Sequence, residues 1–217
     1  MKYNSAQELI NKEIDSSVRA KLYSAIINGN DVAQEILKSP IFAGSNITNN
    51  ISGRLINYVI LHQFEQDILL NKLPFALDII ETNKFGYKNV MLKNDNIMIN
   101  VARCAGQNNI FPSKAKFRSE RCLLNNLEQN SLFWDFGNGQ VKEGPIFVLL
   151  AYYTNNDKIT RANIIVPDVS MSKPLALCNL MIEPQNRLML LDNDNKEKQI
   201  LKLKETVLKE LKQTSVK

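Results

Sequence analysis

The sequence predicts a single α+β domain, in which N-terminal helices and one long helix pack on an antiparallel sheet of about five strands. Two observations support this fold class. Through residues 5–73, apolar side chains recur every three or four positions, which is the spacing of amphipathic helices. From residue 75 onwards the spacing falls to two, and Asn-rich turns separate short apolar segments, as in an antiparallel meander. We expect the long helix to cover the apolar face of this sheet.

The N-terminal part of the chain is expected to be helical. Ser5 precedes Glu8 by three residues, the spacing of a capping box, in which the serine side chain accepts a hydrogen bond from the backbone. Apolar residues continue at helical spacing as far as Asn28-Gly29-Asn30, where the glycine predicts a helix end. Asp31 is expected to cap a third, short helix that ends near Lys38.

The strongest helical pattern runs over residues 46–73, where apolar side chains form a broad stripe that Pro74 ends. Strands are expected at residues 75–80, 88–93, 97–104, 145–154 and 159–166. Further along, we expect a short helix or strand at 175–182, a short strand at 188–191 and a Lys-rich amphipathic helix at 196–212. The predicted organisation is an α+β core (45–192) between a helical annex (1–44) and a basic C-terminal helix (193–217).

The composition limits the class of protein and of partner. The 217 residues include 27 lysines and arginines against 22 acidic residues, and the formal charge of +5 favours an acidic partner. No apolar segment follows the charge at the N-terminus, and the longest apolar run, Ile146–Tyr153, is far shorter than the ~20 residues that span a membrane. We therefore expect a cytoplasmic protein without a membrane partner. The abundance of Asn, Lys and Ile is typical of an AT-rich genome and suggests a bacterial or phage origin.

Several chemistries have no support in the residues. His62 is the single histidine, and its place among apolar residues of the long helix indicates a partly buried side chain at the seam between helix and sheet. Three scattered cysteines have neither zinc-ligand spacing nor the even number of a disulfide framework. The sequence also lacks a phosphate-binding glycine motif, because Gly137-Asn138-Gly139 is too short and reads as a turn. We expect no resident cofactor.

A helix followed by three antiparallel strands resembles the restriction-endonuclease-like core. That resemblance implies an Asp on one core strand and an Asp/Glu-x-Lys pattern on the next, which together hold a divalent ion and activate water. Here Asn100 stands where a carboxylate is needed, and no lysine follows two residues later. We therefore do not assign the chain to this family.

A nuclease is nevertheless the enzyme alternative to test. Its metal-dependent form would use Glu65, Asp78 and Glu81 with Mg²⁺, and these would otherwise be solvated or hydrogen-bonded carboxylates. Its metal-independent form would be a ribonuclease that uses Arg103, Lys114 and a tyrosine such as Tyr152.

The most informative segment is Pro112–Arg121. Lys114, Lys116 and Arg118 alternate with small or apolar residues, and in an extended segment this spacing places all three cations on one side. Such a row suits a line of phosphates, because neutralising each phosphate releases counterions. The expected nucleic-acid-binding residues are Lys84, Lys88, Arg103, Lys114, Lys116, Arg118 and Arg121, and nearby aromatics that could stack on bases are Phe85, Tyr87, Phe111, Phe117 and Trp134.

These observations predict a non-catalytic, nucleic-acid-binding accessory protein that contacts phosphates through the basic segment. The third alternative is a protein-interaction module, such as an inhibitor or an antitoxin-like partner, that uses the C-terminal helix or the segment around Trp134. The same helix could pair with a second copy of the chain, because one side is apolar and the other is rich in lysine.

Overall fold

The computed structural model describes residues 3, 5–40, 42, 46–81, 88–125 and 145–182. The helices in this part of the chain are α1 (Ala6–Glu13), α2 (Ser16–Leu37), α3 (Asn46–Leu69), α4 (Lys116–Cys122) and the short 3-10 helix η1 (Leu123–Asn125). The strands are β1 (Ala76–Glu81), β2 (Lys88–Lys93), β3 (Ile97–Arg103), β4 (Ile146–Asn155), β5 (Lys158–Pro167) and β6 (Pro174–Asn179). The mixture of helix and sheet confirms the predicted class, and the predicted strands lie within a residue or two of the observed ones.

The N-terminal helices begin where the sequence predicts, but the predicted boundary between them is wrong. Ser5 caps α1 as predicted, since its side chain accepts a hydrogen bond from the Glu8 backbone at 3.1 Å. The predicted helix end at Gly29 is wrong, because α2 continues through it to Leu37. A Cβ at position 29 would lie only 2.7 Å from the Cα of Ile60 in α3. The glycine therefore permits the close packing of two helices and does not end one.

The long helix is shorter than the pattern predicts. It ends at Leu69, and Asn71 reverses the chain with a φ of 56°, a left-handed geometry that asparagine tolerates. The apolar pattern in the sequence extends past the end of the helix, because Leu70 and Leu73 lie in the turn that leads into β1.

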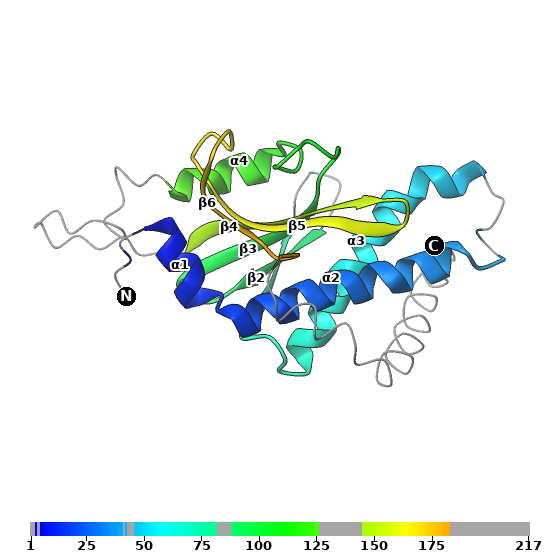
Figure 1. Ribbon diagram of the computed structural model, residues 1–217, viewed down its shortest axis with the longest axis horizontal. Helices are drawn as coiled ribbons and strands as arrows, with labels where there is room; N and C mark the ends of the chain where they lie inside the picture. Colours follow the sequence, from blue (N-terminus) through cyan, green and yellow to red (C-terminus); the bar gives the residue numbers. More distant parts are fainter. Residues whose placement is uncertain are drawn as a thin grey trace, which may run out of the picture.

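The sheet has six strands in the order β1-β2-β3-β4-β5-β6, and neighbours are antiparallel except for β3 and β4. The prediction of about five strands in an all-antiparallel sheet is therefore wrong in both respects. The parallel pair requires the chain to return to the starting edge, which needs a crossover of a dozen or more residues. Residues 104–145 provide that crossover and contain α4. Figure 1 shows α4 on the opposite side of the sheet from α2.

The two faces of the sheet pack against different layers. On β4, the side chains of Ile146, Val148, Leu150 and Tyr152 join the apolar cluster of α1, α2 and α3. The alternate residues Phe147, Leu149 and Ala151 join a smaller cluster with Cys122 of α4. Strand β4 is thus buried on both faces, as its nearly continuous apolar sequence predicts.

Several predicted segments lie outside the described residues. They are the strand at 188–191, the C-terminal helix at 196–212, and the positions of Lys84 and Trp134. Among the helices that the structure describes, none combines the length and the apolar character needed to cross a membrane.

Candidate nucleic-acid interface

The basic segment folds differently from the extended row that its spacing predicted. Helix α4 begins at Lys116, directly after Ala115 at its N-cap, so neighbouring cations diverge around a helix. The Lys116 side chain is 89% exposed and its ammonium lies 3.9 Å from Glu120, while Lys114 is exposed just before the helix. The prediction that these lysines and Arg118 form a single row is wrong, because Arg118 turns toward the sheet.

Arg118 is held by neutral oxygen atoms. Its Nε donates to the Oδ1 of Asn100 on β3 at 2.8 Å, and its Nη1 donates to the carbonyl of Ser113 at 2.8 Å. Asn100 in turn donates to Asn89 on β2 at 3.4 Å. Burial lowers the pKa of Arg118 from its ordinary value, but a guanidinium still carries its charge at neutral pH. A cation with only neutral acceptors retains its full positive field.

Arg161 on β5 makes a second contact of the same kind, and no sequence pattern pointed to it. Its guanidinium donates to the carbonyls of Gly106, Gln107 and Asn109, and it lies 5.7 Å from the ring centre of Tyr153. These bonds fix the loop that connects β3 to α4. Together with the bond from Arg118 to Ser113, they determine where Lys114 is presented to solvent.

Arg103 lies apart from this cluster. Its side chain is on the face of the sheet that packs against α3, since it follows Ile99 and Val101 with the same alternation. Its Nη1 is next to Gly53 of α3. The sheet therefore separates Arg103 from Arg118, although the two are close in sequence. Of the remaining predicted cations, Lys88 begins β2 with a side chain that lies outside the described part, as does all of Lys84.

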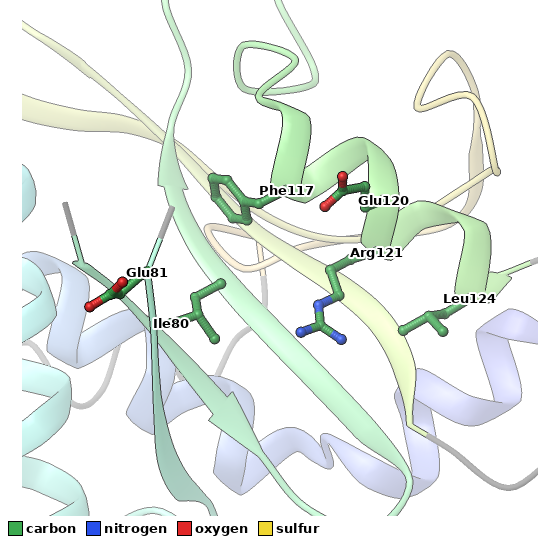
Figure 2. Close-up of a pocket in the computed structure, with 6 residues that line it drawn as sticks. All are labelled: Ile80, Glu81, Phe117, Glu120, Arg121 and Leu124. Carbon is green, nitrogen blue, oxygen red and sulfur yellow. The ribbon is translucent and has the colours of Figure 1, made fainter. Parts of the chain in front are cut away.

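A groove of about 280 Å³ lies between α4 and the edge strand β1 (Figure 2). Phe117, Arg121 and Leu124 face it from the helix side, because they are spaced three or four residues apart. Its lining is completed by Ile80, Glu81 and Glu120. With two carboxylates and one guanidinium, this groove has no excess of positive charge and is a poor site for phosphates. Arg121 therefore lies in a groove that also holds the carboxylates of Glu81 and Glu120.

The candidate catalytic carboxylates do not come together. The Oε2 of Glu65 lies 3.0 Å from the Nδ1 of His62, whose ring is buried in α3. Asp78 is half-buried on β1, and Glu81 faces the groove. Within the described ranges, no group of three His, Cys, Asp or Glu side chains is arranged to hold a metal ion. At the β3 position where the nuclease pattern needs a carboxylate, the structure has the amide of Asn100, which is hydrogen-bonded to Asn89 on β2.

The three residues of the ribonuclease alternative are also divided. Tyr152 is fully buried, and its hydroxyl donates to the Oδ1 of Asn57 on α3 at 3.1 Å. Burial raises the pKa of Tyr152 above its ordinary value, an effect that the nearby charge of Arg103 only partly offsets. Lys114 lies on the α4 side of the sheet, where its charge acts to lower the pKa of Cys122. Tyr152 and Lys114 therefore cannot act on one substrate group.

The cysteines give a test of this packing. Burial raises the pKa of Cys122 to about 11 and raises that of Cys104, so both remain thiols at neutral pH. Cys178 is only half-buried. We expect iodoacetamide to alkylate Cys178 first in the native protein at pH 7.5, with Cys104 and Cys122 labelled in urea, and Cys122 also as the pH approaches 11. Mass spectrometry of timed samples measures this order, and equal labelling of Cys122 and Cys178 at pH 7.5 would contradict the packing of α4.

Comparison of the chain with protein-family models, with curated proteins and with solved structures gives no match.

Proposed function

We propose that this chain is a non-catalytic nucleic-acid-binding protein, which contacts phosphates through the α4 basic surface. This surface comprises Lys114, Lys116, Arg118 and Arg161. The proposal is carried by one observation: the groups that accept hydrogen bonds from Arg118 and Arg161 within the described part of the chain are neutral oxygens and, for Arg161, the thiol of Cys104. Their charges therefore remain uncompensated beside two exposed lysines.

The four residues have two different roles in the proposed binding. Lys114 and Lys116 are exposed and can reach phosphates directly. Arg118 and Arg161 fix the loop before α4 through hydrogen bonds to its carbonyls, and they add two positive charges to this loop. Glu120 is the single carboxylate of residues 103–122, the segment that contains Lys114, Lys116 and Arg118, so the local field is positive. Ion pairing at the surface weakens this field little, because the Lys116–Glu120 pair is long and exposed.

The non-catalytic part of the proposal is supported by the amides of Asn89 and Asn100. They occupy neighbouring strands and are hydrogen-bonded to each other, and Asn100 also accepts from Arg118. A divalent cation bound here would therefore lie beside a guanidinium. Such a cluster favours anions over metal ions.

The proposal predicts a specific change in salt dependence. Replacing both Lys114 and Lys116 with alanine is expected to reduce the slope of log K against log[salt] by roughly 1.4–1.8, because each phosphate contact contributes about 0.7–0.9. Fluorescence anisotropy with a labelled oligonucleotide measures the slope. The control is Lys173→Ala, an exposed lysine in the loop between β5 and β6, which should leave the slope unchanged. An unchanged slope in the double variant would count against this surface.

A protein partner is the second candidate, and the groove beside β1 favours it. The groove presents both signs of charge, and Ile79 on the adjacent edge strand is 57% exposed. Edge strands and apolar residues of this kind bind extended peptides. A nanomolar complex with a protein that persists at high salt and is lost in Arg121→Glu would favour this function, because apolar contact is not screened.

A further inference from the structure

Arg103 ends β3 with a guanidinium for which the described residues provide no acceptor. Its Nε is buried without a hydrogen bond, and no hydrogen bond or ion pair engages the side chain in the described part of the molecule. The Arg103 side chain as a whole is half-buried, and even partial desolvation of an unpaired charge is costly. The side chain is therefore poised toward an acceptor that the described residues do not provide.

Helix α3 leaves room for this guanidinium. A Cβ at Gly53 would lie 2.4 Å from the Nη1 of Arg103, a distance that no side chain can adopt without displacing it. Glycine in a helix interior costs stability relative to alanine. The absence of a side chain at Gly53 thus allows Arg103 to pack against the helix.

A second donor lies one turn further along the same face of α3. Asn57 follows Gly53 by four residues, which places the two on one side of the helix. The Oδ1 of Asn57 accepts the hydroxyl of Tyr152, the residue paired with Arg103 across the parallel strands. That bond fixes the amide, so its Nδ2 group is left as a donor without a described partner. Arg103 and Asn57 together present donors only.

We propose that Arg103 and the Nδ2 of Asn57 bind one phosphate group. A tetrahedral oxyanion can accept from a planar guanidinium and from an amide on another element, and still keep an oxygen for an ester bond. The position at the carboxyl ends of parallel strands is one where α/β proteins commonly hold ligands. The phosphate comes from a nucleic-acid backbone, in which case the inference rests on the proposed function, or from a free nucleotide or inorganic phosphate.

The test uses the full chain with inorganic phosphate, a nucleoside 5′-monophosphate and a short oligonucleotide, in sodium chloride of matched ionic strength. Thermal unfolding and calorimetric titration measure binding. We expect each phosphate source that binds to raise Tm in the wild type and in Arg54→Ala, which removes an exposed charge beside Gly53. Arg103→Met is expected to raise Tm without phosphate, to abolish the phosphate-dependent rise, and to weaken binding about 10- to 100-fold.

Gly53→Ala provides a second variant that keeps Arg103 but displaces its guanidinium, and it should also weaken phosphate binding. Phosphate binding unchanged in both Arg103→Met and Gly53→Ala would overturn the inference, as would a wild type that binds none of the three ligands. Oligonucleotide binding that is unaffected by Arg103→Met, in a wild type that binds neither inorganic phosphate nor the nucleotide, would overturn the inference while leaving the proposed function standing. Loss of inorganic phosphate binding in Arg103→Met, with no oligonucleotide binding in the wild type, would support the inference and overturn the proposed function.

Discussion

Replacing Asn125 with alanine is expected to lower the free energy of unfolding by roughly 3–5 kcal/mol. Asn125 is 2% exposed at the end of η1, and its amide fills the gap where the ladder between β4 and β5 has opened. Its Nδ2 donates to the carbonyls of Phe147 and Pro167 at 2.8 and 2.9 Å, and its Oδ1 accepts the Phe147 N–H at 2.9 Å. Alanine leaves three buried backbone groups without partners. Each such group costs about 1–3 kcal/mol.

Urea denaturation followed by circular dichroism measures this loss. The matched control is Asn155→Ala, an exposed asparagine at the end of β4, for which a change within about 0.5 kcal/mol is expected. If Asn125→Ala lost less than about 1 kcal/mol, the attachment of η1 and α4 to the sheet would be wrong.

Replacing Gly29 with valine is expected to cost about 3 kcal/mol, at the upper end of the range for overpacked cores. At this position α2 and α3 approach so closely that a Cβ would meet the Cα of Ile60 at 2.7 Å and its Cγ1 at 3.0 Å. Backbone cannot move aside as a flexible side chain can, so the two helices must separate. The separation would loosen the apolar cluster between these helices and the sheet.

The control for this variant is Gly106→Ala in the loop before α4. A Cβ there would meet only the Asn109 side chain, at 3.5 Å, which is an ordinary contact. Thermal unfolding should show a lowered Tm for Gly29→Val and little change for Gly106→Ala. Equal Tm values for Gly29→Val and the wild type would show that α2 and α3 do not pack as described.

Local signals in the sequence predicted most of the elements. The Ser5 cap, the turn at Asn94–Asn96 and the turn at Asn155–Asp157 depend on neighbouring residues, and Asn156 and Asp157 adopt the positive φ that such turns require. Other features depend on packing between distant parts of the chain, which local signals do not report. Gly29 looked like a helix end, because the close approach of Ile60 comes from a distant part of the chain.

The candidate site was predictable in composition but not in arrangement. The cationic segment was visible in the sequence, yet its alternation indicated a strand and concealed the helix α4. Arg118 is half-buried because it meets Asn100 across the crossover, a contact that depends on the parallel pairing of β3 and β4. Arg161 gave no signal, since it is a single arginine in a predicted strand. Gly53 gained a role only once Arg103 was placed beside α3.

Nucleic-acid binding itself is tested most directly by titrating the unmodified chain against labelled single-stranded DNA, double-stranded DNA and RNA. Fluorescence anisotropy is measured at about 50 and 200 mM salt, with and without Mg²⁺. We expect binding to at least one of them, at least about tenfold weaker at the higher salt, with the probe left intact when Mg²⁺ is present. Absence of binding to all three at low salt would contradict the account, and cleavage of the probe in Mg²⁺ would contradict its non-catalytic part.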